Sequence, residues 1–220
     1  MDVKELIKNR HSVRQFKETP IADELREKLD ALAGQINEES GLNIQVIYDD
    51  PECFDNLLAR YGKFKNAVNY IALVGVKDME NLDETAGYYG QKMVLAVQEM
   101  GLRSCWVGGT YSKGKCKIDK NKGEKLVCVI AIGYGESDGT KHKSKDVSKL
   151  CNISESEMPT WFKNGMVAAM MAPTAMNQQK FFVTLNVDEV IITPRKGPYT
   201  KVDLGIVKYN FEAVTGKKCK

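Results

Sequence analysis

A chain of 220 residues with 43% hydrophobic and 28% charged residues is long enough to bury one full core and has the composition of a soluble globular protein. The net charge of +3 is small and the lysines are spread along the chain, so nucleic-acid binding is not indicated. No apolar run approaches the roughly 20 residues that span a bilayer. The stretch MDVKELIKNR also lacks the apolar core of an export signal. We therefore expect a cytoplasmic protein with no membrane partner.

The cysteines and histidines give no pattern typical of a metal site. Six cysteines stand far apart, no CxxC pair occurs, and only two histidines are present. Reduced cysteines in a cytoplasmic protein are the simplest account. Cys105 and Cys128 lie in apolar runs, so we expect them to be packing residues. No metal site is predicted.

A short first helix around residues 3–7 is predicted to lead into the densest cluster of anion-binding side chains, RHSVR at residues 10–14. In an extended segment, alternation places Arg10, Ser12 and Arg14 on one side, with His11 between them. The planar fork of arginine suits phosphate because it donates paired hydrogen bonds. The alternative is a solvated basic turn.

The next elements are predicted from their hydrophobic periodicity. An amphipathic helix over residues 25–36 is followed by an alternating strand at 43–48 and a polar helix at about 52–61. Residues 70–76, YIALVGV, form a continuous apolar run of strand length, which is typical of a central strand.

The stretch Gly87–Gly109 is predicted to be a rigid unit of helix, turn and strand. Tyr89, Met93, Val97 and their neighbours share one helical face, and Gly101 suits the helix end, where positive φ is common. A short strand at 104–107 then stops at the pair Gly108 and Gly109, where the backbone can approach something flat or bulky. An ordinary helix–strand crossing is the alternative.

Beyond this unit, a basic loop at 111–123 is a candidate lid and leads to a second central strand at 126–132. The glycines after that strand lack the third glycine of a Rossmann fingerprint. Lys141–Lys145 is read as a solvated turn when taken alone. A buried helix is expected to begin near Pro159 and to end before Pro173.

The loop Pro173–Gln179 is rich in side-chain amides that must find hydrogen-bond partners. A planar heterocycle is one suitable partner, and a capped turn that satisfies its own backbone is the alternative. Strands at 181–185 and 190–193 follow. A last amphipathic helix over 204–214 is predicted, with Asp203 as its cap.

Three of these pieces together resemble the nitroreductase family of FMN-dependent oxidoreductases. The segment RHSVR resembles the family's R-x-S-x-R element, residues 101–109 resemble its G-L-x-x-x-W-x-G element, and residues 130–135 resemble the strand that follows. The family's P-S-x-x-N-x-Q element is missing after the second helix and is matched instead by residues 173–179. The sequence is therefore similar to a divergent branch, the "putative TM nitroreductase" group.

The resemblance implies a fold and a single domain. The fold is an α+β (α/β) sandwich with a central, mainly antiparallel sheet flanked by helices, over residues 1–220. A homodimer is implied as well, and the loop at 173–179 could serve the flavin of its own chain or of the partner.

The resemblance also implies a set of FMN-binding residues. Arg10, His11 and Ser12 would hold the phosphate and ribityl chain, and Lys143 and Lys145 could close the phosphate site. Arg14 would lie near the pyrimidine edge of the ring, where its charge stabilises the anionic reduced flavin. Gly108, Gly109 and Thr110 would lie beside the reactive nitrogen. The side chains expected to bond flavin edges are Thr174, Asn177 and Gln179.

The implied activity is a two-step exchange in which NAD(P)H reduces bound FMN and a nitroaromatic, quinone or similar acceptor reoxidises it. No side chain of the enzyme is expected to be catalytic, since the cofactor carries the chemistry. Three alternatives stay open. One is a flavoprotein that breaks down flavin or removes halogens, another is a non-enzymatic FMN-binding protein, and the last is a relative that has lost the cofactor.

Overall fold

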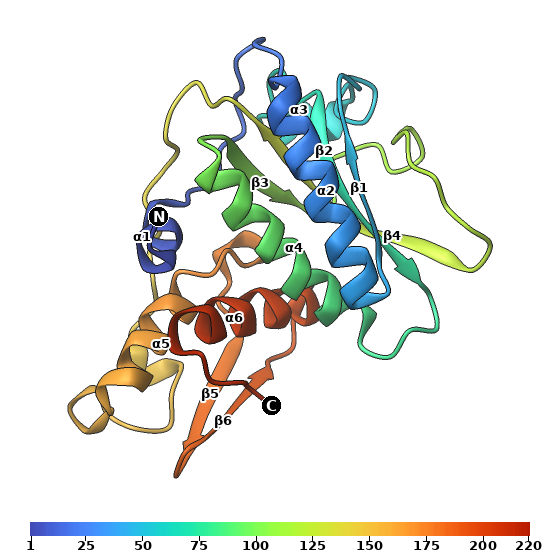
Figure 1. Ribbon diagram of the computed structural model, residues 1–220. Helices are drawn as coiled ribbons and strands as arrows, with labels where there is room; N and C mark the ends of the chain where they lie inside the picture. The colour runs from blue at the N-terminus through green and yellow to red at the C-terminus, as the bar shows by residue number, and fades with distance from the viewer. The chain divides into compact units, whose positions relative to one another are not determined.

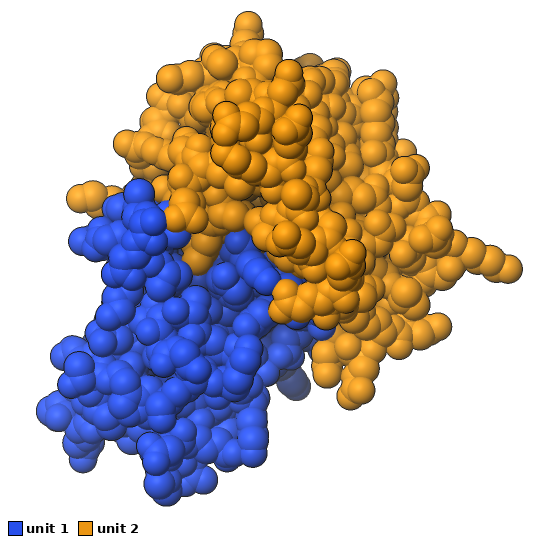
Figure 2. All heavy atoms as spheres, viewed as in Figure 1, with its two compact units in different colours: residues 1–9, 83–92, 142–220 blue, residues 10–82, 93–141 orange.

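The computed structural model describes residues 1–220, and the chain divides into two compact units (Figure 2). Unit 1 comprises residues 1–9, 83–92 and 142–220, and unit 2 comprises residues 10–82 and 93–141. The helix α4 (Leu82–Glu99) contributes its first part to unit 1 and its last part to unit 2. None of the helices combines the length and the apolarity needed to cross a membrane.

Unit 2 is built on a four-stranded sheet in which every neighbouring pair is antiparallel (Figure 1). The strand order is β1-β2-β4-β3, so the two continuous apolar runs of the sequence form the inner pair. This confirms the prediction of two central strands. The strands are β1 (Asn43–Ile47), β2 (Asn69–Val76), β3 (Arg103–Val107) and β4 (Glu124–Gly133).

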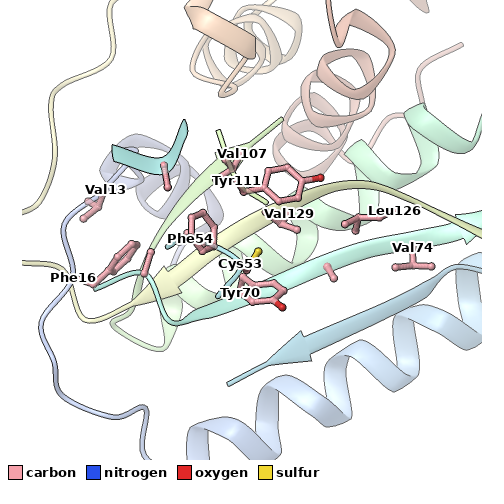
Figure 3. Packing of buried hydrophobic residues seen from close by; sticks show 14 residues of the cluster. Val13, Phe16, Cys53, Phe54, Tyr70, Val74, Val107, Tyr111, Leu126 and Val129 are labelled. Carbon is pink, nitrogen blue, oxygen red and sulfur yellow. The ribbon is translucent and has the colours of Figure 1, made fainter. Parts of the chain in front are cut away.

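Both faces of this sheet are covered, which explains why its inner strands are apolar throughout. The helix α2 (Asp23–Ser40) lies along one face (Figure 1). On the other face, Tyr70 and Val74 of β2 pack in a cluster with Phe54, Tyr111 and neighbouring residues (Figure 3). Alternate residues of a strand point to opposite faces, so one strand serves both layers.

A β-bulge adjusts the register of the inner pair. Leu73 pairs with Cys128 and Val74 pairs with Leu126, so Val127 has no partner on β2. The extra residue changes the alternation of β4, and as a result Leu126 and Val129 lie in the same cluster despite their odd spacing.

The segment after the first helix covers the edge of the sheet at β3. Ser12 forms a parallel bridge with Ser104, and the Val13 amide donates to the Ser104 carbonyl oxygen at 3.0 Å. Phe16 then bridges to Gly135. An exposed strand edge leaves backbone groups unpaired, and this segment satisfies part of that edge with residues 12–16.

Unit 1 is mainly helical with a separate antiparallel hairpin. Two short 3₁₀ turns, residues 147–149 and 155–157, lie in the connection that begins at residue 142. A third, residues 175–177, lies in the loop at 173–179. Its remaining elements are α1 (Val3–Asn9), α5 (Thr160–Met170), β5 (Phe181–Asn186), β6 (Glu189–Pro194) and α6 (Thr200–Thr215).

Glycines let the helices of unit 1 approach closely. A Cβ placed on Gly205 of α6 would lie 1.9 Å from the Glu84 carbonyl oxygen, and one on Gly87 of α4 would lie 2.0 Å from that of Val202. Gln91 of α4 also donates to the Asn210 side chain at 3.0 Å. The crossing of α4 and α6 therefore depends on two missing side chains.

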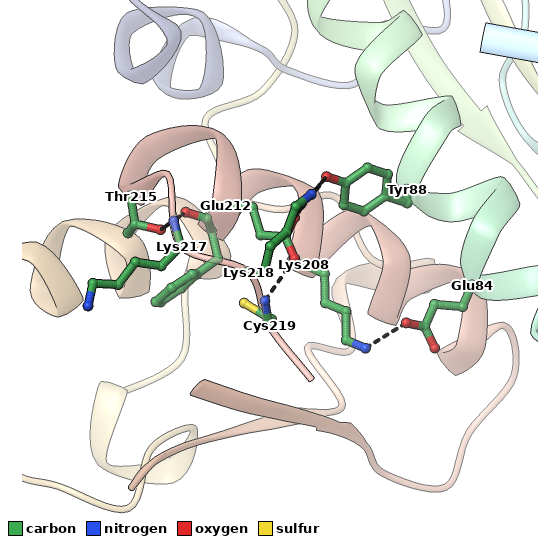
Figure 4. A network of polar contacts seen from close by, with 9 residues as sticks. Glu84, Tyr88, Lys208, Glu212, Thr215, Lys217, Lys218 and Cys219 are labelled. Atoms are coloured by element: carbon green, nitrogen blue, oxygen red, sulfur yellow. Dashed lines mark hydrogen bonds and ion pairs between the residues drawn. The ribbon is translucent and has the colours of Figure 1, made fainter. Parts of the chain in front are cut away.

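A polar network joins α4, α6 and the last residues of the chain in unit 1 (Figure 4). Glu212 accepts hydrogen bonds from the Tyr88 hydroxyl and the Lys218 ammonium, both at 2.8 Å, and from the Cys219 amide at 2.9 Å. Lys208 forms an ion pair with Glu84 at 2.6 Å. These contacts hold residues 218–219 beside α6.

Two local predictions differ from the structure. The helix expected over residues 52–61 begins only at Leu57 as α3 (Leu57–Tyr61), because Asn56 caps it by accepting from the Ala59 amide. Asp203 does not cap α6. The helix begins at Thr200, after Tyr199 in the left-handed conformation, and the Asp203 side chain bonds another loop instead.

Candidate functional site

The site in unit 2 is built around a buried arginine without a carboxylate partner. Arg10 is 4% exposed, and it forms no ion pair with an aspartate or glutamate. Burial lowers the pKa of Arg10 to about 10, and the nearby Cys105 thiol opposes that shift. A buried cation is costly unless an anion or hydrogen-bond acceptors compensate it, so this position calls for a negatively charged ligand.

Ser12 and Arg14 lie beside the same thiol as Arg10. Ser12 and both arginines act to lower the pKa of the Cys105 thiol of β3, Arg10 and Arg14 through their positive charge. Burial nevertheless raises the pKa of Cys105, so the thiol stays protonated and does not neutralise the guanidiniums. The alternation predicted from the sequence thus brings two guanidiniums and a hydroxyl to one place on β3.

The loop that follows β4 packs against the segment of residues 10–14. Arg103 of β3 donates to Asp138 through Nε at 3.2 Å and Nη2 at 2.6 Å. Gly139 has φ +80°, and a Cβ there would lie 2.9 Å from the Ser12 carbonyl oxygen and 3.0 Å from Cβ of His11. Only a glycine fits so close to the backbone at positive φ, so Gly139 fixes the loop against His11 and Ser12.

Gly108, Gly109 and Thr110 follow the end of β3, four to six residues beyond Ser104. In a strand this spacing corresponds to roughly 13–20 Å along the chain direction. Gly109 is exposed, and the Thr110 side chain packs against Gly62, where a Cβ would meet it at 2.9 Å. The two glycines and Thr110 therefore lie beyond the end of the strand whose residue Ser104 pairs with Ser12.

In unit 1 the side chains of Thr174, Asn177 and Gln179 in the loop Pro173–Gln179 bond one another and the backbone of residues 143 and 145. Gln179 is 2% exposed, and its amide accepts from the Lys145 backbone N–H and donates to the Lys143 carbonyl oxygen, both at 2.8 Å. The Asn177 side chain also donates to the Lys143 carbonyl and accepts from Gln179. Thr174 Oγ1 accepts from the Gln179 amide N–H at 3.0 Å. The capped turn that the sequence left open as an alternative is present.

These bonds hold a strained backbone. Met176, Asn177 and Gln179 have φ of 53°, 50° and 43°, which is the left-handed region. Such conformations in residues other than glycine cost of the order of 1 kcal/mol each and persist only where the surroundings impose them. The hydrogen bonds from residues 143–145 supply that constraint.

Gln178 of this loop and Asp203 of α6 bond each other, a contact that the sequence did not reveal. Asp203 accepts from the Ala175 amide at 2.9 Å and from Gln178 Nε2 at 2.8 Å. Burial raises the pKa of Asp203 to about 6, although both hydrogen bonds act in the opposite direction. Gln178 Oε1 is buried and has no donor in the chain. The only indication of this contact in the sequence was an aspartate expected at the start of a helix.

The basic residues of unit 1 differ from Arg10. Lys145 Nζ donates to the carbonyl oxygens of Gln178 at 2.5 Å and Gln179 at 3.3 Å. Lys143 is exposed, and its backbone carbonyl is the part that the loop uses. The predicted residues thus form two groups. Arg10, His11, Ser12, Arg14, Gly108, Gly109 and Thr110 belong to unit 2, and Lys143, Lys145, Thr174, Asn177 and Gln179 belong to unit 1.

Solved structures resemble either nearly the whole chain or about two thirds of it. A solved structure described as a putative nitroreductase from Thermotoga maritima matches with a TM-score of 0.71 and 20% identity, over 97% of this chain and 83% of that one. A nitroreductase-like protein from Streptococcus mutans matches with a TM-score of 0.57 and 15% identity, over 69% and 97%. No curated protein matches the sequence.

A further solved structure, described as a putative nitroreductase in complex with FMN, comes from Desulfovibrio desulfuricans. It matches with a TM-score of 0.53 and 23% identity, over 68% of this chain and 95% of that one. At these identities the structures establish the fold, which is the expected α+β nitroreductase fold with a mainly antiparallel sheet.

The family model described as "Putative TM nitroreductase" matches residues 2–215 and so includes both units. Membership in a nitroreductase family supports an oxidoreductase activity. With nearly the whole sequence matched, the chain belongs to the putative TM nitroreductase family, as its three motifs predicted.

Proposed function

We propose that this protein is an FMN-dependent oxidoreductase in which NAD(P)H reduces the flavin and a nitroaromatic, quinone or similar acceptor reoxidises it. The observation that carries the proposal is Arg10, a guanidinium that is 4% exposed and has no carboxylate partner. FMN carries a phosphate dianion, which is the kind of ligand that a buried arginine and a neighbouring hydroxyl bind well. The residues present therefore fit this cofactor.

The residues of unit 2 take distinct roles in this proposal. Arg10 and Ser12 bind the phosphate, with His11 held beside them. Arg14 is exposed and places positive charge farther along β3, where it favours a negatively charged ring. Gly108, Gly109 and Thr110 line the ring with little side-chain bulk. When bound, FMN supplies hydride transfer, and the chain supplies binding, orientation and charge.

The loop Pro173–Gln179 has a positioning role in this proposal. Its amides bond Lys143, Lys145 and each other, so the loop presents a fixed backbone rather than free side chains. Direct bonds from Thr174, Asn177 and Gln179 to flavin stay a prediction, as does the homodimer. The dimer is tested by light scattering of the purified protein.

The first test is the absorption spectrum of the purified protein before and after heat release of any bound molecule. Flavin bands, with FMN as the released species, are expected. NADH and NADPH are then titrated separately, and bleaching of the flavin by at least one of them is expected. A colourless protein that also fails to take up added FMN contradicts the proposal. FMN that neither nicotinamide reduces would instead indicate a flavin-binding protein without this activity.

The second test measures FMN affinity after Arg10→Ala. Loss of one charge-assisted contact of about 1.5–3 kcal/mol corresponds to a roughly 10- to 100-fold weaker Kd. Arg60→Ala is the matched control, because Arg60 is an exposed arginine of the same unit that contacts only Asp55, at 3.7 Å. Equal affinities for the two variants would contradict the assignment of Arg10 to the phosphate.

A further inference from the structure

Two cysteines far apart in the sequence meet in unit 2. Cys53 Sγ and Cys116 Sγ are 2.7 Å apart, and both are free thiols. Cys53 is fully buried in the turn before α3 and joins the cluster drawn in Figure 3, and Cys116 is half-buried and packs against that cluster.

Backbone contacts hold this pair together independently of the sulfur atoms. The Ser112 amide donates to the Cys53 carbonyl oxygen at 2.8 Å, and the Lys117 amide donates to the Tyr70 hydroxyl at 2.9 Å. These two bonds fix residues 112–117 on either side of Cys116. Two cysteines whose backbones are already positioned can be bridged with little movement.

A buried carboxylate organises the surroundings of the pair. Asp50 is fully buried and accepts from the Tyr70 hydroxyl at 2.6 Å, while Lys117 Nζ lies 3.6 Å from its other oxygen. The hydrogen bond between the two thiols raises the pKa of Cys53 and lowers that of Cys116. Asp50 opposes that lowering. The two thiols therefore differ in pKa, and Cys116, which is the more exposed one, has the greater thiolate character.

We propose that Cys53 and Cys116 form a reversible disulfide that tethers the loop at residues 111–123 to the turn before α3 when the protein meets a hydroperoxide. The inference does not depend on FMN binding, because every residue that it uses belongs to the cluster around Cys53 and to this loop.

The oxidation proceeds in two balanced steps. The Cys116 thiolate attacks one oxygen of hydrogen peroxide, the O–O bond breaks, and a sulfenic acid and hydroxide form, the hydroxide then taking up a proton as water. The Cys53 sulfur next attacks the sulfenic sulfur, the S–O bond breaks, and the Cys53 proton leaves with the oxygen as a second water. Overall, two thiols and one peroxide give one disulfide and two waters. A dithiol reductant reverses the reaction by exchange.

The test begins with the full-length protein, reduced, freed of reductant and treated with hydrogen peroxide. Its intact mass is expected to fall by about 2 Da for two hydrogen atoms, with two of the six thiols lost. A tryptic peptide pair that joins Cys53 to Cys116 identifies the bond. Dithiothreitol is expected to restore the original mass.

Variants assign the reaction to this pair. Cys116→Ser is expected to abolish the loss of 2 Da, and Cys53→Ser to do the same if it folds. Cys151→Ser is the matched control, because Cys151 is a buried cysteine of unit 1 and its loss leaves the pair intact. Addition of oxygen to Cys116 without a cross-link, or a cross-link through other cysteines, overturns the proposal.

Proteolysis tests the tether itself. The loop carries exposed lysines that trypsin can cut, including Lys113, Lys115 and Lys120. We expect these sites to be cleaved several-fold more slowly in the oxidised protein than in the reduced protein, with no such difference for Cys116→Ser. Equal cleavage rates in the two wild-type forms would show that the disulfide does not restrain the loop.

Discussion

Two basic stretches, residues 10–14 and 141–145, have similar compositions, yet their charges are used in opposite ways. Arg10 is buried without a carboxylate, whereas Lys145 binds two backbone carbonyl oxygens and Lys143 extends into solvent. A buried cation without a partner indicates a missing anion, since an uncompensated charge is costly. A solvated or backbone-bound cation carries no such indication. Basic composition alone therefore does not locate an anion site.

The largest expected effect comes from removing the side-chain amide of Gln179, which bonds residues 143, 145 and 177. Gln179→Ala leaves the Lys145 amide and Asn177 Oδ1 without their partner and removes one of the two donors to the Lys143 carbonyl oxygen. At 1–3 kcal/mol for each group left unsatisfied, and allowing for water, the free energy of unfolding should fall by about 2–4 kcal/mol. Urea denaturation measures it. Gln35→Ala, at an exposed position of α2, is the control and should change little.

Asp203 of α6 sharpens the comparison because it is a titratable group that accepts hydrogen bonds from that loop. Its pKa is raised to about 6 from 3.8, so the folded state binds the proton more tightly than the unfolded state. The resulting stabilisation is complete below pH 4 and is lost as pH rises to about 6, in total about 2–3 kcal/mol. Thermal unfolding across this range should show the decline, and Asp203→Asn should remove it. A wild-type profile that is flat from pH 4 to 6 would contradict this account.

Arg10 should respond in the opposite direction to Gln179. Arg10→Met removes a buried charge that has no carboxylate partner, so the protein without FMN should gain about 1–2 kcal/mol in its free energy of unfolding. Its FMN affinity should fall in parallel. Denaturation with and without saturating FMN separates the two effects. A clear loss of stability without FMN would mean that the chain itself compensates this guanidinium.

The smallest effect is expected at Lys143. Since its side chain is exposed, Lys143→Ala should alter the free energy of unfolding by no more than about 0.5 kcal/mol. If the side chain reaches the phosphate as the resemblance implies, the FMN Kd should rise by about threefold at low salt and less at high salt. A loss of affinity as large as that of Arg10→Ala would remove the distinction between the two basic stretches.

The sheet could be predicted from the sequence because the hydrophobic pattern of each strand is contained in consecutive residues. β2 and β4 are buried on both faces, and their residues are therefore apolar in continuous runs that can be read directly. The same holds for Arg10, Ser12 and Arg14, which strand alternation alone places together. Helix ends depend on a single residue, and Asn56 caps α3 so that the helix begins at Leu57, five residues later than predicted.

The parts that could not be predicted are contacts between distant residues. Cys53 and Cys116 stand 63 positions apart, and neither a period nor a spacing connects them. Asp203 has the residue type and approximate position of a cap, but its partners at Ala175 and Gln178 lie in another segment. In both cases the tertiary fold decides what a side chain contacts, and the local pattern does not contain that information.

The interleaving of the two units has a consequence for synthesis. Residues 10–141 complete unit 2, so its sheet can close while the ribosome is still adding residues 142–220. Unit 1 must wait, because β6 pairs with Cys219 and Glu212 binds Lys218. Until then, the part of α4 that carries Gly87 lacks the α6 residues that pack against it in unit 1. A nascent chain arrested near residue 190 should therefore be the form that chaperones retain longest.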